Sequence, residues 1–158
     1  PYMGYNNIAY PVKIYEMFRK IWYHRDLLII EGEASRLGVG NDLFAGAKSI
    51  KRILAPPENA FEKYLEIYST AKRSANKNML LLIALGPTAT VLAYDLSKAG
   101  FQALDVGNID IEYEWFLRGA TFKEKIPGKY TSEARGGREV SNSHLNEEYH
   151  QEIIARII

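Results

Sequence analysis

A strand, a helix and a second strand follow one another in the middle of the chain, and this unit constrains the fold more than any other feature of the sequence. Residues 79–85 form an unbroken apolar run of strand length, and residues 101–106 form a second short apolar segment. Residues 89–99 between them have the spacing of an amphipathic helix that ends at Gly100. Two strands joined by a helix are parallel neighbours in a βαβ unit. We therefore predict an α/β fold of the Rossmann-like type, a mainly parallel sheet with helices on both faces.

The remaining segments fit the same architecture. We expect further helices over residues 11–24, 42–49, 59–75, 110–119 and 146–158, and further strands over residues 27–30 and 50–54. Asn59, followed by Glu62, resembles a capping box at the start of one of these helices. No linker long enough to divide the chain is present, so residues 1–158 are expected to form a single domain.

The composition excludes several classes of protein. The 158 residues carry 20 Lys and Arg against 19 Asp and Glu, and this net charge of +1 favours neither nucleic acid nor an anionic membrane as a partner. The longest apolar run is shorter than the ~20 residues of a membrane-spanning helix. The chain has no cysteine, which excludes disulfides, Cys-ligated zinc and iron–sulfur clusters and fits a reducing compartment, so we expect a cytoplasmic protein. A homo-oligomer is compatible with this composition.

The loop after the first predicted strand carries residues suited to phosphate. In an open parallel sheet, ligands bind beyond the carboxyl ends of the strands. Gly38 and Gly40 permit unusual backbone angles, and Arg36 can hold phosphate oxygens. The loop lacks the spacing of both the dinucleotide-binding fingerprint and the P-loop. The alternative is a plain turn in which Arg36 pairs with Glu31 or Glu33.

Two more polar positions follow the strands of the βαβ unit. Gly86 and Thr88 stand where its helix begins, and the free N–H groups of a helix N-terminus suit an anion. Plain helix capping is the alternative. Asp105 ends the second strand about 20 residues after Gly86, the interval at which Rossmann units place an acid against a ribose.

Acidic residues beyond that strand are candidates for metal binding or proton transfer. Asp110 and Glu112 spell D-x-E, and two carboxylates on a loop can chelate Mg²⁺ or Mn²⁺. On a helix their side chains diverge, and the alternative is an acid-rich helix N-terminus. Residues 118–138 are basic, and such a segment either closes over an anionic ligand or is solvated surface. Hydrolase and zinc motifs are missing from the sequence.

Several long runs of residues together carry a family resemblance. They span residues 31–44, 84–93, 105–107, 109–115 and 125–130. In the same order, they resemble the bacterial GT-D fold glycosyltransferases, a family first defined as a domain of unknown function that includes glucosyltransferases of streptococcal serine-rich repeat adhesins. The resemblance covers the chain from Pro1 to about Tyr130. It implies a nucleotide-binding fold, a UDP-sugar donor and a divalent metal, Mn²⁺ or Mg²⁺.

The resemblance also implies which residues act. In this family an upstream half carries a Gly-Asp-Gly-Glu segment that supplies the metal-binding D-x-E; the sequence does not spell it, so we expect this chain to correspond to the C-terminal portion and assign no metal ligands. The candidate donor-binding residues are Arg36, Gly38, Gly40, Asn41, Gly86, Thr88 and Asp105. The candidate base for the acceptor hydroxyl proton is Glu112, with Asp110 and Glu133 as the next candidates.

These implications predict transfer of a sugar, glucose by analogy, from a UDP-sugar to a glycan hydroxyl on a bacterial surface glycoprotein. Two other functions compete with this prediction. One is a non-catalytic module that binds a nucleotide or a glycan. The other is a different Rossmann-like transferase, such as a methyltransferase, which would use residues 32–40 for its cofactor.

Overall fold

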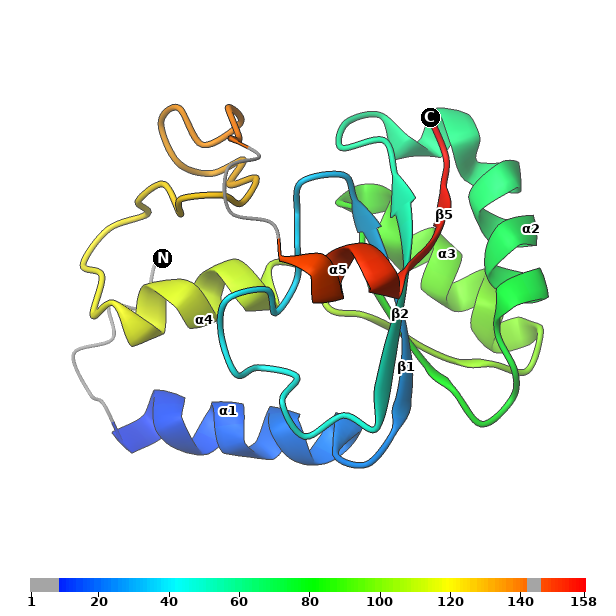
Figure 1. The fold of residues 1–158 in the computed structure, drawn as a ribbon, viewed down its shortest axis with the longest axis horizontal. Helices are drawn as coiled ribbons and strands as arrows, with labels where there is room; N and C mark the ends of the chain where they lie inside the picture. The colour runs from blue at the N-terminus through cyan, green and yellow to red at the C-terminus, as the bar shows by residue number, and fades with distance from the viewer. Residues whose placement is uncertain (1–8, 142–145) are drawn as a thin grey trace.

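A parallel sheet with helices on both faces forms the body of the molecule (Figure 1). The computed structural model describes residues 9–141 and 146–158, and the sheet in this part of the chain has five strands in the order β4-β3-β1-β2-β5. The strands are β1 Asp26–Gly32, β2 Ser49–Ala55, β3 Leu80–Ala84, β4 Gln102–Asp105 and β5 Ile153–Arg156. All paired neighbours run parallel. The predicted fold class is confirmed.

Helices cover the two faces of the sheet as separate layers. They are α1 Ala9–Trp22, the 3₁₀ helix η1 Ala60–Lys63, α2 Tyr64–Ser74, α3 Pro87–Lys98, α4 Ile109–Leu117 and α5 Glu147–Glu152. In Figure 1, α2 and α3 lie on one side of the sheet, and α1 and α4 lie on the other. No helix in the described ranges is both long and apolar enough to cross a membrane.

The central strand β1 supplies side chains to both layers because successive residues of a strand face opposite sides. Leu28 and Ile30 are fully buried in the core that α2 and α3 complete. Leu27 and Ile29 are fully buried in the second core, which includes Trp22 of α1. This burial on both faces explains why the strand has an unbroken apolar sequence.

From the centre of the sheet, the order of the strands runs outward in two opposite directions. From β1 the chain moves to β2 on one side, whereas β3, on the other side of β1, leads outward to β4. Leu37 and Phe44, from the β1–β2 loop, pack in the core on the α1 face, whereas α3 packs on the opposite face. The carboxyl ends of β1 and β3 therefore flank a topological switch point, the usual place for a ligand in an open α/β sheet.

Two predicted local features before α2 differ from the structure. Turns occupy residues 43–46, where a short helix over residues 42–49 was expected, and the Asn41 side chain accepts a hydrogen bond from the Leu43 N–H (3.0 Å). Asn59 has a left-handed backbone (φ 53°) and makes no capping hydrogen bond with its side chain, so the capping box is wrong. In α2, which follows the 3₁₀ turn, the buried residues are Ile67 and Ala71.

The expected C-terminal helix is half helix and half strand. Helix α5 ends at Glu152, and Ile153 begins β5, which pairs in parallel with β2. The Ile157 N–H donates to the Leu54 carbonyl oxygen (2.8 Å) just beyond β5. Pairing with an available sheet edge outweighs the local helical pattern, and β-branched isoleucines favour the strand.

Candidate functional site

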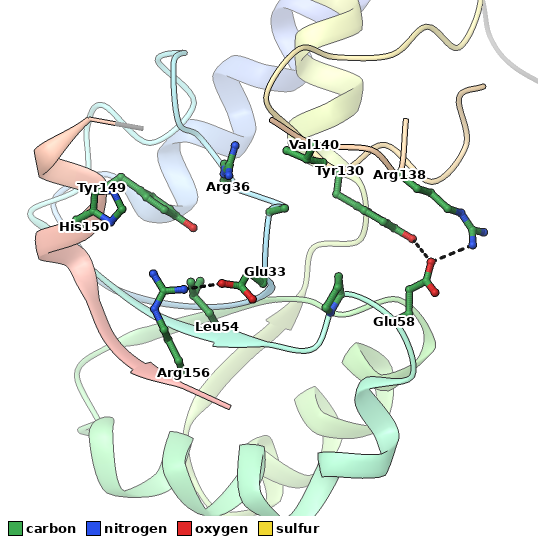
Figure 2. Close-up of a pocket in the computed structure, with 12 residues that line it drawn as sticks. Glu33, Arg36, Leu54, Glu58, Tyr130, Arg138, Val140, Tyr149, His150 and Arg156 are labelled. Atoms are coloured by element: carbon green, nitrogen blue, oxygen red, sulfur yellow. Dashed lines mark hydrogen bonds and ion pairs between the residues drawn. The ribbon is translucent and has the colours of Figure 1, made fainter. Parts of the chain in front are cut away.

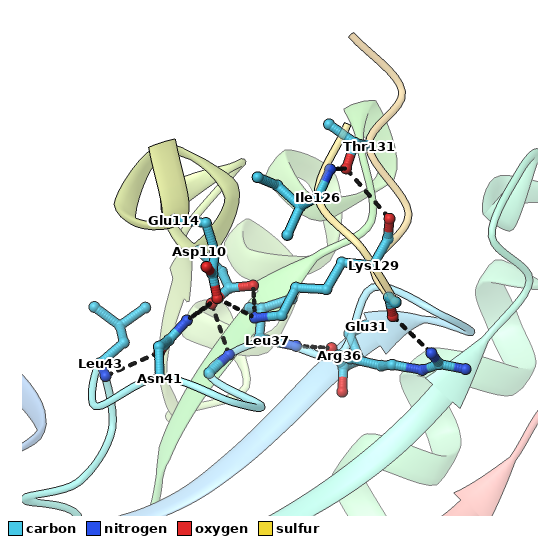
Figure 3. Close-up of polar contacts among 12 residues, drawn as sticks. Glu31, Arg36, Leu37, Asn41, Leu43, Asp110, Glu114, Ile126, Lys129 and Thr131 are labelled. Carbon is cyan, nitrogen blue, oxygen red and sulfur yellow. Dashed lines mark hydrogen bonds and ion pairs between the residues drawn. The ribbon is translucent and has the colours of Figure 1, made fainter. Parts of the chain in front are cut away.

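A buried ion cluster of Asp110, Glu114 and Lys129 lies at the carboxyl edge of the sheet (Figure 3). Asp110 Oδ2 accepts a hydrogen bond from Lys129 Nζ (2.7 Å), and Lys129 Nζ lies 3.3 Å from Glu114 Oε1. Asp110 Oδ1 accepts from the Gly38 N–H and from Asn41 Nδ2, both at 2.9 Å. Asn41 Nδ2 also donates to Glu114 (2.8 Å). The cluster therefore ties together the β1–β2 loop, α4 and the segment that carries Lys129.

The contacts within this cluster indicate the role of Asp110. Its side chain is 2% exposed, and three donors already occupy its two oxygens. Asp110 and Glu114 are four residues apart on α4, so they share one helix face, whereas Glu112 points elsewhere. We therefore interpret Asp110 as a residue that positions the loop and the Lys129 segment, and the predicted D-x-E does not form a chelating pair.

A second buried group lies beneath this edge and is formed by Glu31, Arg52 and Glu152. Arg52 Nη1 donates to Glu31 (2.7 Å) and its Nε donates to Glu152 (2.5 Å). The other oxygen of Glu31 accepts from the Leu37 N–H (2.7 Å), and the Arg52 guanidinium lies 5.1 Å from the centre of the Tyr149 ring. Complete burial raises the pKa of Glu31, although Arg52 acts against this shift. The group links the β1–β2 loop to α5.

A cavity of about 880 Å³ opens beside these groups, beyond the ends of β1, β2 and β5 (Figure 2). Its lining residues are Glu33, Ala34, Arg36, Leu54, Pro57, Glu58, Tyr130, Arg138, Val140, Tyr149, His150 and Arg156. Arginine side chains can bind phosphate or carboxylate oxygens, and tyrosine rings offer flat apolar surfaces. Burial raises the pKa of Tyr149 to about 12, so its hydroxyl is neutral at physiological pH.

Two exposed ion pairs bridge the walls of this cavity. Arg156 Nη1 lies 2.6 Å from Glu33 Oε1, and Arg138 Nη1 lies 2.9 Å from Glu58 Oε1. The same oxygen of Glu58 accepts a hydrogen bond from the Tyr130 hydroxyl (2.9 Å). Burial and this hydrogen bond raise the pKa of Tyr130. Figure 2 shows the two pairs on opposite sides of the cavity.

The predicted donor-binding residues of the β1–β2 loop lie together at this edge. Arg36 lines the cavity, and its Nη1 donates to the carbonyl oxygens of Gly128 (2.6 Å) and Ser141 (3.0 Å). Arg36 Nη1 therefore bonds to backbone carbonyl oxygens, whereas the sequence suggested a pair with Glu31 or Glu33. Gly38 has φ +71°, and a Cβ there would lie 2.3 Å from the ring of Phe44. Gly40 also has a positive φ, but a Cβ there would meet nothing within 4 Å.

Of the predicted donor-binding residues only Arg36 lines the cavity, and the remaining ones outside the β1–β2 loop lie beyond β3 and β4. Gly86 has φ 53° at the start of α3, where a Cβ would meet nothing within 4 Å, and Thr88 is buried in the first turn. Asp105 accepts hydrogen bonds from Thr90 Oγ1 (2.7 Å) and from the Gly107 N–H (2.9 Å). The structure thus separates the predicted donor residues into two groups on the same edge.

Glu112 and Glu133 form an acidic surface beside α4. Partial burial and the neighbouring charge of Glu133 raise the pKa of Glu112, while Lys123 acts against this shift. Glu133 is paired with Lys123 and lies 3.5 Å from Asn108 Nδ2. A carboxylate with a raised pKa is a better proton acceptor near neutral pH, so Glu112 remains a candidate base.

The described residues do not fit a divalent metal. Within residues 9–141 and 146–158, no three His, Asp or Glu side chains converge on a common point that could hold an ion. Asp110 has its oxygens occupied by Lys129, Asn41 and Gly38.

Comparison with known proteins identifies the family. A family model described as a glycosyltransferase GT-D fold matches residues 1–134. The chain belongs to the GT-D fold glycosyltransferase family. Two curated proteins, the probable glycosyl transferase Gly of Streptococcus gordonii and glycosyltransferase GlyD of Streptococcus pneumoniae, are each 43% identical to this GT-D chain. The alignments cover 99% and 100% of the chain but only 23% and 19% of those relatives.

Solved structures agree with this assignment. One, described as the highly conserved domain of unknown function 1792 with a distinct glycosyltransferase fold, is 46% identical with a TM-score of 0.87 over 95% of the GT-D chain. Another, described as a new glycosyltransferase from Streptococcus sanguinis, is 42% identical with a TM-score of 0.85 over 93% of the chain. The GT-D chain spans 53% and 54% of these structures. The predicted family is confirmed.

The sequence patterns did not identify the cations whose ion pairs connect the segments of the site. Lys129, Arg52 and Arg156 were not singled out because a charge in a loop or strand usually marks solvated surface. Only Arg52 carried a signal, since its charge lies inside the predicted strand at residues 50–54. A charged side chain within an apolar strand is a candidate for a buried ion pair.

Proposed function

We propose that this protein transfers a sugar from a UDP-sugar to a hydroxyl of a glycan acceptor, and that the donor binds in the cavity of Figure 2. The observation that carries the proposal is the presence of a basic, tyrosine-lined cavity at the carboxyl edge of the parallel sheet in a GT-D family chain. Ligands of α/β folds bind at this edge. By the resemblance, glucose is the proposed sugar and a bacterial surface glycoprotein carries the acceptor glycan.

The size and chemistry of the cavity suit such a donor. Its volume of about 880 Å³ lies within the range of roughly 300–1,000 Å³ that small-molecule sites occupy. Arginines along the wall complement the charge of a diphosphate. Tyr130 and Tyr149 provide ring surfaces against which a base or a sugar can pack.

In the proposed reaction the acceptor oxygen attacks the anomeric carbon of the donor sugar. The bond between that carbon and the phosphate oxygen breaks, and its electron pair leaves with UDP. The acceptor proton passes to a carboxylate, for which we propose Glu112, because burial and the neighbouring charge of Glu133 raise its pKa. Asp110 is proposed to hold the loop in place, and a divalent metal, if one is used, requires ligands beyond the residues described.

Binding and turnover measurements test this proposal. Calorimetry with UDP in the presence of Mn²⁺ measures donor binding, and a UDP-release assay with several UDP-sugars and glycan acceptors measures transfer. UDP binding followed by release supports the glycosyltransferase. Binding without release under any donor and acceptor supports a binding module, and preference for S-adenosylmethionine over UDP supports a methyltransferase.

Substitution of the proposed base separates chemistry from binding. In Glu112→Gln we expect transfer to fall by at least about 100-fold, because a positioned base contributes on that order, while the affinity for UDP changes by less than about twofold, since Glu112 does not line the cavity. Glu66→Gln, which replaces an exposed acid on α2 outside the cavity lining, is the matched control. Normal turnover in Glu112→Gln would remove this residue from the mechanism.

A further inference from the structure

Each exposed ion pair of the cavity joins an arginine and a carboxylate from separate segments of the chain. Arg156 ends β5 and contacts Glu33, which follows β1 (2.6 Å). Arg138 lies on the segment after α4 and contacts Glu58, which follows β2 (2.9 Å). All four residues line the cavity, so each guanidinium group stands at the cavity wall with a carboxylate as its partner.

We propose that Arg138 and Arg156 are the residues that bind the diphosphate of the ligand, and that Glu33 and Glu58 hold their guanidinium groups until the ligand displaces them. This inference rests on the proposed function, because it assigns the diphosphate of the donor to these side chains. Carboxylate and phosphate oxygens accept the same pairs of guanidinium N–H groups, so one anion can replace the other without moving the arginine far.

The exposure of these pairs makes the exchange feasible. The side chains are 44% to 65% exposed, and ion pairs in such positions contribute little to stability. Displacing them therefore costs the fold little. When Glu58 moves away, the Tyr130 hydroxyl that donates to it is released as well and becomes a further donor for the ligand.

Arg36 serves as the structural contrast within the same cavity. Its guanidinium is buried and donates to the backbone carbonyl oxygens of Gly128 and Ser141, which belong to the segment that also carries Tyr130 and Arg138 of the cavity lining. An anion that displaced these carbonyls would have to move the backbone of this segment. Arg36 is therefore a positioning residue for the segment that carries Arg138.

Family membership does not assign either arginine. The family model matches residues 1–134, and both Arg138 and Arg156 lie beyond that region. They reach the cavity because the segment after α4 folds back over the sheet and because β5 pairs with β2, which places Arg156 at the carboxyl edge.

The inference predicts that removing either carboxylate from the cavity increases the affinity for an anion, and calorimetry tests this. We expect Glu33→Gln and Glu58→Gln to bind UDP and inorganic pyrophosphate about two- to fivefold more tightly in calorimetry, the range that loss of an exposed competing ion pair allows. We expect Arg156→Gln and Arg138→Gln to weaken both ligands by at least about tenfold, since each loses a charge-assisted hydrogen bond.

Matched controls separate this effect from a general change of charge. Glu66→Gln and Arg73→Gln change the same charges at exposed positions of α2, which contributes no residue to the cavity lining, and should alter each affinity by less than about 1.5-fold at physiological salt, where exposed charges away from the cavity are screened. When Arg156→Gln is already present, adding Glu33→Gln should no longer tighten binding, because the guanidinium for which the carboxylate and the ligand compete is already absent.

The outcomes distinguish this inference from the proposed function. If UDP binds but the four cavity variants behave like their controls, the diphosphate assignment is wrong and the donor proposal stands. If pyrophosphate binds with the expected pattern while UDP does not bind more tightly than pyrophosphate, the oxyanion site stands and the UDP-sugar proposal fails. If neither UDP nor pyrophosphate binds the wild-type protein, the assignment of Arg138 and Arg156 is overturned.

Discussion

Two kinds of ion pair occur side by side at the carboxyl edge, and they differ in burial although their residues are close in the sequence. Lys129 is 5% exposed and bonded to Asp110, whereas Arg138 on the same segment is 65% exposed and paired with Glu58. Removing one partner of a buried pair leaves an uncompensated charge, whereas an exposed charge is solvated by water. The buried pairs therefore maintain the shape of the edge, and the exposed pairs can exchange partners with a ligand.

The same contrast occurs within three residues at the end of β1. Glu31 points into the protein and bonds to Arg52, and Glu33 reaches the cavity and bonds to Arg156. Both carboxylates are paired with an arginine, so pairing alone does not distinguish them. Burial does, because it decides whether water can replace the partner.

Replacement of the buried cation should have the largest effect. Lys129→Met keeps most of the aliphatic stem but leaves Asp110 and Glu114 without their shared positive charge. We expect the free energy of unfolding to fall by about 3–5 kcal/mol, the usual cost of removing one partner from a buried pair. Urea unfolding measures this difference.

Lys125→Met is the matched control for Lys129→Met. Lys125 is exposed on the same segment, and its replacement should change the free energy of unfolding by less than about 0.5 kcal/mol. Equal effects of the two variants would show that the buried ion cluster does not stabilise this edge.

Two glycines of the β1–β2 loop also differ in how much an alanine in their place should lower the free energy of unfolding. Gly38→Ala places a Cβ 2.3 Å from the buried ring of Phe44 and should cost about 2–4 kcal/mol, from steric overlap together with the left-handed backbone. Gly40→Ala meets no atom within 4 Å, so only the backbone penalty of about 1–2 kcal/mol applies. Thermal unfolding of both variants checks the order, and a larger cost for Gly40→Ala would contradict it.

Much of the sheet could be predicted from the sequence because its central strands are buried on both faces. Residues 79–85 and 27–30 are continuous apolar runs, which local patterns identify without knowledge of partners. The strand β5 could not be predicted in this way. Ile153 adopts a strand because it pairs with Arg52 of β2, a contact between residues far apart in the sequence.

The candidate site could be predicted only as far as its loops. Arg36, Gly38 and Asn41 were expected at one edge, and the structure places them there together with Asp110. What the sequence does not show is how each group is satisfied. Whether Asp110 faces solvent, a metal or Lys129 depends on how a segment 19 residues further along the chain folds back.

Glu31 provides a test of the buried group through pH. Burial raises its pKa above the ordinary value of 4.5. At a pH between 4.5 and the raised pKa, the folded protein therefore binds more protons than the unfolded chain. The stabilisation from protonated Glu31 is thus full at low pH and is lost as the pH rises through the window, by about 1.4 kcal/mol for each unit of the shift. In Glu31→Gln this dependence should vanish.

Urea unfolding of wild type and Glu31→Gln from about pH 4.5 upward measures the difference in stability. The wild type should lose stability relative to the variant as the pH increases. Arg52 and Asp110 face the same carboxylate and are unchanged in both proteins, so their charges cancel in the comparison. A difference that is constant with pH would mean that Glu31 titrates as an ordinary exposed acid.

The exposed pairs should have the smallest effect on stability. Glu33→Gln and Arg156→Gln each break a contact between side chains that are 60% and 44% exposed. Water solvates the remaining partner, so we expect the free energy of unfolding to change by less than about 1 kcal/mol in either variant. Urea unfolding on the samples used for ligand titration measures this directly. A loss of stability comparable with that of Lys129→Met would show that the Glu33–Arg156 pair stabilises the fold. Displacement of this pair by a ligand would then destabilise the protein, which contradicts the proposed exchange.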